Sequence, residues 1–349
     1  MNTSKHPTWS RREFLHGLIL AGGAGLLGLR SGTAVAESPP ETTTIRLVFD
    51  PEIPVLCYAP QYVAEHFLRI EGFTEIRYVP FTRDDSGHNE GSDTKVLVSG
   101  AADIAAALHV DLIAAIDKNQ PITVIGGLHA GCFELFASKE VRTISELKGR
   151  RVAVTALGSP EHNFIAGIAA YIGLDPSQDI EWVNADPNDW AAMLAEGKVD
   201  AIGTFPPLGY DLHANDVGHV ILYTTVDEPW RHYFCCMVGA RRDFVQNYPS
   251  ATKRALRAIL KANQLCSLEP ERTARWLVDR GYEANYAYAL QTLQDVQYSA
   301  WRDYDPDDTL RFYSLRLRDA GFIKSTPQQI IAQGTDWRFF NELKKELKA

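Results

Sequence analysis

Side chains that could hold a small ligand stand just after the predicted strands of this chain. Ligands of open α/β sheets bind at the carboxyl ends of the strands, so residues at these positions are the first candidates for contact. A further group stands where the chain turns back after the last of these strands. The complete candidate set is Glu52, Pro54, Cys57, Tyr58, His109, His129, Cys132, Gly158, Ser159, His162, Phe205, Trp230, Arg231 and His232.

Ser159 is the most specific of these candidates because it precedes Pro160 and opens a helix predicted to run through Ile172. The free N–H groups and the dipole of a helix N-terminus suit an anion or a polar ligand head. The alternative is that Ser159 only caps its own helix. Glu161 stands in the first turn and competes for the same positive field.

The remaining candidates each have a structural alternative. Arg231 could clamp an anionic group, or it could form a surface ion pair. Trp230 could stack on a ring of the ligand, or it could pack in the core. The histidines could contact ligand, or they could be packed or lie on the surface. The aromatic and histidine content favours an organic ligand, with an anionic group left open.

Motifs of catalysis and of metal binding are absent from the sequence. It contains no G-x-S-x-G, no H-E-x-x-H, no C-x-x-C and no glycine-rich phosphate loop. The adjacent Cys235 and Cys236 favour opposite faces of a strand over a metal site. The five cysteines allow one disulfide, but its partners cannot be identified from the sequence. We therefore expect no catalytic residue, no metal and no cofactor.

Strands and helices alternate along most of the chain, which is typical of parallel α/β sheets. After residue 248 the pattern is mostly helical. Strands are predicted at 44–49, 75–79, 103–107, 122–128, 133–137, 151–155, 180–183, 201–204 and 220–223. Helices are predicted at 60–69, 95–98, 112–117, 141–148, 160–172, 190–195 and 251–266.

The N-terminus has the pattern of an export signal. Paired Arg11 and Arg12 precede a short apolar run at 18–29, and Ala34-Val35-Ala36 offers an A-x-A cleavage site. The run is shorter than the ~20 apolar residues that span a bilayer. We predict a twin-arginine signal peptide over 1–36 and a soluble periplasmic product. The alternative is an N-terminus that stays uncut as a membrane tether.

Length and charge limit the classes of function. The part of the 349-residue chain that follows the predicted signal is long enough for two domains. The formal net charge of −9 argues against nucleic acid, which requires a basic surface. An anionic ligand is still compatible, because a pocket can be locally positive on an acidic protein.

Three segments carry a resemblance to a known family. They are Val96 to Ala105, with its L-x-x-G-x-A-D-I-A pattern, Ile144 to Val154, and Met193 to Ala201. Asn247-Tyr248-Pro249 and Gly321-Phe322-Ile323 fit later helices of the same family. In this order, from about residue 44 to 340, the chain resembles the periplasmic substrate-binding proteins of nitrate, sulfonate and taurine ABC importers.

The resemblance implies a two-lobed α/β fold of the type II periplasmic-binding-protein class, with a mostly parallel sheet in each lobe and a hinge. It places the first part of lobe 1 at 42–130, lobe 2 at 131–236, and the return to lobe 1 with C-terminal helices at 237–349. The implied partners are a small-molecule ligand, an ABC permease and ATPase and the twin-arginine export machinery, and the implied state is a monomer.

Two other classes of function compete with import. One is an enzyme similar to the thiamin-pyrimidine synthases, which share the fold but carry a C-C-C-F-C cluster. This chain has only Phe234-Cys235-Cys236-Met237 at its paired cysteines, and does not match that cluster. The other is a periplasmic sensor that presents its ligand to a receptor. We expect a binding protein and no enzymatic activity.

Overall fold

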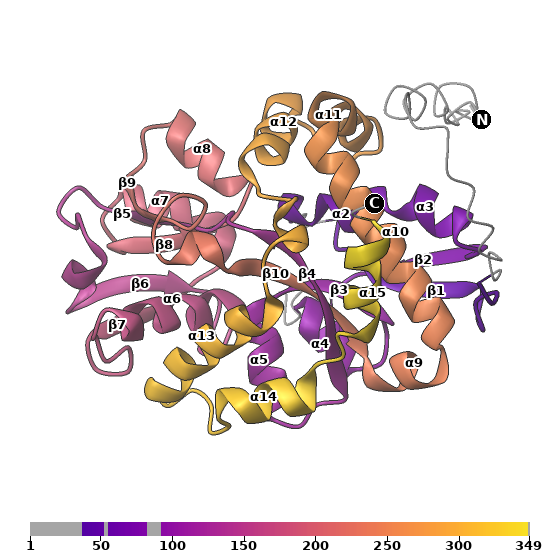
Figure 1. Ribbon diagram of the computed structural model, residues 1–349. Coiled ribbons are helices and arrows are strands. Elements are labelled where there is room, and N and C mark those ends of the chain that lie inside the picture. The colour runs from indigo at the N-terminus through magenta and orange to yellow at the C-terminus, as the bar shows by residue number, and fades with distance from the viewer. Residues whose placement is uncertain (1–36, 52–54, 82–91, 348–349) are drawn as a thin grey trace. The chain divides into compact units, whose positions relative to one another are not determined.

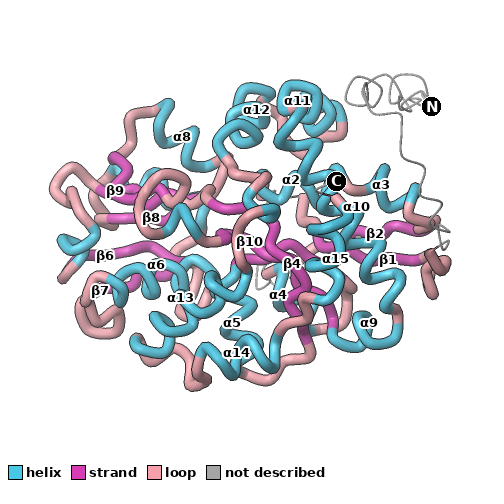
Figure 2. The backbone as a smooth tube through the Cα atoms, in the orientation of Figure 1, coloured by secondary structure: helices cyan, strands magenta, loops and turns pink. Residues whose placement is uncertain are grey.

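The computed structural model describes residues 37–51, 55–81 and 92–347. The predicted signal peptide, Glu52 and Pro54 lie outside the described residues. The described residues from Pro39 onward form one compact unit. Figure 1 shows its strands in two groups, and Figure 2 shows helices packed around both.

The first sheet, here sheet 1, has five strands in the order β2-β1-β3-β10-β4. Strands β1, β2 and β3 are parallel, and β10 runs antiparallel to β3 and β4, which lie on either side of it. The bounds are β1 Thr44–Val48, β2 Glu75–Val79, β3 Ile104–Leu108, β4 Ile122–Ala130 and β10 Phe234–Arg241. The prediction from sequence did not include β10, which pairs with strands more than a hundred residues earlier.

The second sheet, here sheet 2, repeats this topology in the order β7-β6-β8-β5-β9. Here β6, β7 and β8 are parallel, and β5 is the antiparallel strand between β8 and β9. The bounds are β5 Glu134–Ala137, β6 Arg150–Val154, β7 Ile180–Asn184, β8 Ala201–Thr204 and β9 His219–Tyr223. Both sheets are therefore mixed, with one reversed strand in each.

An arginine–aspartate clamp occurs at the same place in both sheets. The Arg46 backbone N–H on β1 donates to Asp103 Oδ2 at 2.9 Å, and the Arg46 guanidinium also bonds this carboxylate. In sheet 2 the Arg151 backbone N–H donates to Asp200 Oδ2 at 2.9 Å, again with a guanidinium contact. Each aspartate stands three residues after a glycine with positive φ, which is Gly100 in sheet 1 and Gly197 in sheet 2. These turns explain why the G-x-x-D pattern occurs twice in the sequence.

Helices surround both sheets and join them (Figure 1). Helix α13 packs against α5, which follows β3 of sheet 1, and against α6, which follows β6 of sheet 2. The α-helices are α2 Ala59–Val63, α3 Glu65–Ile70, α4 Asp93–Val98, α5 His109–Asp117, α6 Pro160–Tyr171, α7 Trp190–Ala195, α8 Leu208–Ala214, α9 Arg242–Asn247, α10 Pro249–Leu268, α11 Pro270–Asp279, α12 Tyr286–Asp295, α13 Pro306–Asp319, α14 Pro327–Gly334 and α15 Arg338–Glu346. Short 3-10 helices are η1 Leu56–Tyr58, η2 Ile144–Leu147, η3 Pro187–Asp189, η4 Trp230–His232 and η5 Ala300–Arg302.

The chain passes between the sheets in two places. Residues 131–133 connect β4 of sheet 1 to β5 of sheet 2, and residues 224–233 lead from β9 back to β10. Within the described residues, no helix combines the length and the apolar character needed to cross a membrane.

Candidate functional site

A pocket of about 450 Å³ lies at the carboxyl ends of strands from both sheets. Residues from sheet 1 line it just after β1, β2 and β3, and residues from sheet 2 line it just after β6, β7 and β8. The loops that follow parallel strands gather at one edge of each sheet, which is why a ligand site forms there. Of the residues predicted to contact ligand, Tyr58 and Phe205 line this pocket.

Aromatic rings supply much of the wall. Tyr58 and Trp190 are buried, with 5% and 4% of their surface exposed, and Phe205 is half-buried. The Phe205 ring lies edge-on to Phe133, with 5.3 Å between the ring centroids. These rings are held by the core on one side and face the cavity on the other, so they suit an apolar or aromatic ligand body.

Acidic side chains give the pocket its polarity. Asp93 begins α4 and Asp111 lies in the first turn of α5, and both residues line the cavity. Ser92, the N-cap of α4, donates its hydroxyl hydrogen to Asp111 Oδ2 at 2.8 Å. Among the described lining residues there is no lysine, arginine or histidine. The sequence analysis did not select either aspartate, because a carboxylate at the start of a helix is also a common surface feature.

The two aspartates titrate abnormally for physical reasons. Burial, followed by nearby negative charges, raises the pKa of Asp93 well above its ordinary value. Burial also raises the pKa of Asp111, and the hydrogen bond from Ser92 partly opposes this shift. A ligand with a positive charge or several N–H donors would relieve both effects by stabilising the ionised carboxylates.

The N-terminus of α6 holds a carboxylate from its own chain. Glu161 Oε1 accepts hydrogen bonds from the Thr155 backbone N–H at 2.7 Å, from the Thr155 hydroxyl at 2.5 Å and from the Ser159 hydroxyl at 2.5 Å. Ser159 also caps the helix by accepting from the His162 N–H at 3.3 Å. Glu161, which lines the pocket, therefore takes the position in which Ser159 was expected to favour an anion.

Two of the predicted histidines lie in the protein interior near the pocket without lining it. His109 is fully buried against Phe164 and Tyr313, and burial lowers its pKa to about 3. His162 packs against Trp182, and its Nδ1 accepts from the Gly158 N–H at 2.9 Å.

The segment at 230–232 also lies outside the pocket lining. Trp230 is buried, and its ring meets Tyr171 edge-on at 5.5 Å between centroids. Arg231 and His232 are exposed and both contact the carboxylate of Glu228, at 2.6 and 2.8 Å. The packed tryptophan and the surface ion pair correspond to the structural alternatives for these residues.

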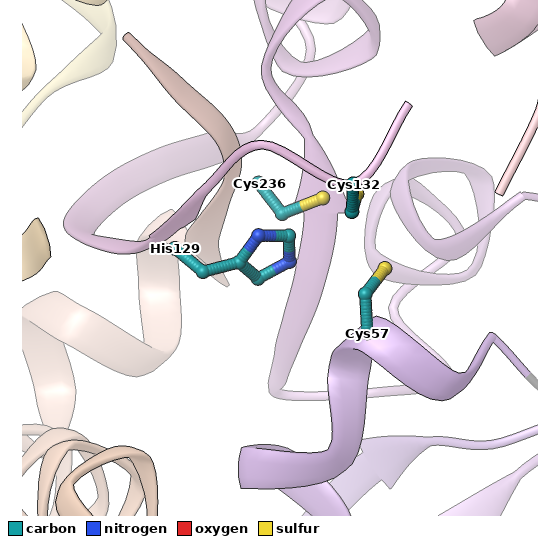
Figure 3. Close-up of side chains that lie close together, drawn as sticks. All are labelled: Cys57, His129, Cys132 and Cys236. Carbon is teal, nitrogen blue, oxygen red and sulfur yellow. The ribbon is translucent and has the colours of Figure 1, made fainter. Parts of the chain in front are cut away.

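Three more of the predicted residues, Cys57, His129 and Cys132, come together elsewhere. With Cys236 they form a buried group whose sulfur and nitrogen atoms lie within 4.8 Å of one another (Figure 3). The sequence analysis considered metal only for Cys235 and Cys236. The spacing His129-x-x-Cys132 was the available signal, but the other two ligand candidates stand 72 residues before and 104 residues after this pair.

Comparison with known proteins places this geometry in a family. Residues 87–278 match the model of the NMT1-like family. The periplasmic nitrate-binding protein NrtA from Synechocystis PCC 6803 has a TM-score of 0.70 and 17% identity over 89% of this chain and 90% of that chain. The alkanesulfonate-binding protein SsuA from Xanthomonas axonopodis pv. citri, bound to MOPS, has a TM-score of 0.63 and 17% identity over 85% and 99%. At such low sequence identity these similarities show only a shared fold. A desulfurization enzyme, DSZB, has the same fold, with a TM-score of 0.58 to this chain.

A curated relative matches over a shorter stretch. The bicarbonate-binding protein CmpA of Synechococcus is 26% identical over 100 residues, which are 29% of this chain and 22% of that protein. The match therefore spans about a fifth of the length of the curated relative. Together these findings confirm the family resemblance and the periplasmic-binding-protein fold predicted from the sequence motifs.

Proposed function

The chain belongs to the NMT1-like family, and we propose that it is the solute-binding component of an ABC importer, working in the periplasm. The pocket at the carboxyl ends of both sheets is the observation that carries this proposal. A small solute captured there contacts both sheets at once, so its binding favours an arrangement that a membrane permease can distinguish from the empty one.

We propose that the two sheets belong to two lobes joined by a hinge. Lobe 1 comprises 42–130 and 234–349, and lobe 2 comprises 134–223, because the end predicted for lobe 2 at residue 236 falls inside β10 of sheet 1. The short connections at 131–133 and 224–233 are the only chain links between the sheets within the described residues, which supports their role as the hinge. Closure about these segments would narrow the pocket, since its two walls follow strands of different sheets.

The ligand class follows from the lining. Aromatic side chains with the carboxyl groups of Asp93 and Asp111 suit a small organic solute that carries a positive charge or several N–H donors. The relatives named for nitrate, sulfonate and bicarbonate take anions, and this chain is proposed to differ from them. The elevated pKa values of both aspartates support this difference, because a bound anion would raise these values further.

The proposed route to the periplasm is the twin-arginine signal at 1–36, with cleavage near Ala36 and a monomeric product. Replacement of both Arg11 and Arg12 by lysine should abolish export. N-terminal sequencing of the exported chain should begin near Glu37. Normal secretion of the double variant would exclude the twin-arginine route.

A thermal-shift screen of the full-length chain tests the proposed ligand class. A ligand that binds only the native state raises the melting temperature. The screen compares matched pairs of small aromatic amines and aromatic carboxylates, with nitrate, bicarbonate and an alkanesulfonate as further anions. Stabilisation by an amine supports the proposal, and stabilisation by anions alone contradicts it. Mass spectrometry of the amine after incubation should show no chemical change, whereas turnover would favour an enzyme.

A further inference from the structure

Four ligand-type side chains from three distant segments meet in the interior. Cys57 comes from η1, His129 from β4, Cys132 from the connection after β4, and Cys236 from β10. Their sulfur and imidazole nitrogen atoms all lie within 4.8 Å of one another. All four residues are at most 1% exposed. Figure 3 shows the thiols of Cys57 and Cys236 and the imidazole ring of His129 directed toward the space beside Cys132.

The imidazole of His129 lacks the partner that its burial demands. His129 is 0% exposed, and among the described residues neither of its ring nitrogens has a hydrogen bond of normal geometry, although the thiols of Cys57 and Cys236 lie beside the ring. A buried polar group without a partner is costly, and most such groups in proteins are hydrogen-bonded or bound to an ion. A metal ion at the centre of the thiols would supply the missing partner for one of these nitrogens.

The donor set matches a closed zinc site. Zn²⁺ in structural sites is tetrahedral and is commonly bound by three cysteine sulfurs and one histidine nitrogen. Bonds of about 2.3 Å in a tetrahedron separate the sulfur atoms by about 3.8 Å. The spread of 4.8 Å therefore requires a contraction of about 1 Å or less. With all four positions filled by protein, no position is left for a substrate.

The backbone favours this arrangement of thiols. Cys132 has φ 99°, which is rare for a residue other than glycine, and follows Gly131 with φ 75°. Its N–H is held by the Thr225 hydroxyl at 3.1 Å. Strand β10 has register shifts on both sides of Cys236. Both irregularities direct side chains into the cluster at the point where the chain passes from sheet 1 to sheet 2.

We propose that Cys57, His129, Cys132 and Cys236 bind one Zn²⁺ ion as a structural site between the pocket wall and the crossing strands. Binding forms three Zn–S bonds and one Zn–N bond, releases the three thiol protons to solvent and leaves a centre with net charge −1. Cys57 directly precedes Tyr58, which lines the pocket. The ion would therefore fix one wall of the pocket to the connection between the sheets.

A disulfide is the competing use of the same sulfur atoms. The Cys132 thiol donates to Cys235 Sγ at 3.3 Å, so oxidation of this pair would remove one zinc ligand. The two outcomes are distinguishable, because a disulfide lowers the mass of the chain by two hydrogens and binds no metal. Mass spectrometry of the protein as isolated under non-reducing conditions should show reduced cysteines together with zinc.

The test on the unaltered sequence uses the full-length chain, reduced, stripped with a chelator and then supplied with Zn²⁺ alone. Elemental analysis should find one zinc per chain. X-ray absorption should give three sulfur neighbours at about 2.3 Å and one nitrogen at about 2.0 Å. Uptake below a tenth of an equivalent, a shell of oxygen atoms, or a Cys132–Cys235 disulfide in the metal-free protein would each overturn the proposal.

Matched cysteine variants identify the ligands. C132S should weaken zinc binding at least 100-fold in competition with a chromophoric chelator. C266S removes another buried cysteine, on α10 outside the cluster, and should retain one zinc per chain with unchanged affinity. Equal loss in both variants would contradict the assignment. Circular dichroism tests whether each variant is folded. If C132S does not fold, the X-ray absorption spectrum of the unaltered chain tests the ligand assignment instead.

Discussion

Substitution of His109 by glutamine should reduce the acid sensitivity of the fold. His109 is 0% exposed, and its Nδ1 lies 2.7 Å from the carbonyl oxygen of Cys235, so that Nδ1–H donates to this oxygen in the neutral ring. Within the described residues, Nε2 has no hydrogen-bond partner. Burial lowers the pKa of His109 to about 3, because a charged imidazolium would lose its hydration there.

The magnitude follows from proton linkage. The unfolded chain binds a proton at His109 near pH 6.5, whereas the folded chain does so only near pH 3. Between these values the unfolded state holds more protons, so the free energy of unfolding falls as the pH falls. The contribution of His109 is fully present above about pH 6.5. By pH 5 it has fallen by about 2 kcal/mol, since each unit of pH is worth about 1.4 kcal/mol.

Urea denaturation of the full-length chain between pH 7.5 and 4.5 measures this effect. The H109Q variant should lose about one proton from the pH dependence of the free energy of unfolding, whatever its stability at neutral pH. Y313F is the matched control, because it keeps a ring against His109, where the centroids are 3.8 Å apart, and should retain the full slope. An unchanged slope in H109Q would refute the assignment of a buried neutral imidazole.

Three further predictions concern the helix cap, a buried ion pair and the pocket. S159A should lower the free energy of unfolding by about 1 kcal/mol in urea, because α6 loses its N-cap; an unchanged midpoint would contradict the capping role. E71Q should cost about 3 kcal/mol, because the buried Glu71 carboxylate pairs with Arg257 at 2.8 Å and with Lys261 at 3.1 Å, whereas E75Q in an exposed pair should cost much less; equal costs would refute this. F205A removes an aromatic ring from the pocket wall, so calorimetry should show that the Kd for the ligand found in the thermal-shift screen rises about tenfold. An unchanged Kd would show that Phe205 does not contact the ligand.

Much of the fold could be predicted because its signals are local. The strand Glu75–Val79, the helix Trp190–Ala195 and the strand Ala201–Thr204 have the predicted bounds, since each alternating or apolar run begins directly after a polar residue. The helix predicted at 60–69 is divided at Ala64 into α2 and α3. Strand β10 was missed because its pairing with β3 and β4 is long-range and leaves no local pattern beyond a short apolar run.

The site was harder to predict than the fold. Tyr58 and Phe205 follow strand ends, so the strand-end rule selected them. Asp93 and Asp111 stand at the starts of helices, where an acid is usual for electrostatic reasons, and only their position in the pocket wall distinguishes them. The thiol and imidazole cluster depends on a left-handed Cys132 and an irregular β10, which the sequence pattern does not reveal.

The charge preference of the pocket is the most direct test of the account. Isothermal titration of the full-length chain with the aromatic amine selected in the screen should give tight binding. D111N should weaken this binding at least tenfold, because it removes the carboxylate of a half-buried residue that lines the pocket. D308N, which alters an exposed acid on α13, should leave it unchanged. Tight binding of nitrate, bicarbonate or an alkanesulfonate by the unaltered chain, together with amine binding that D111N leaves unchanged, would contradict the account.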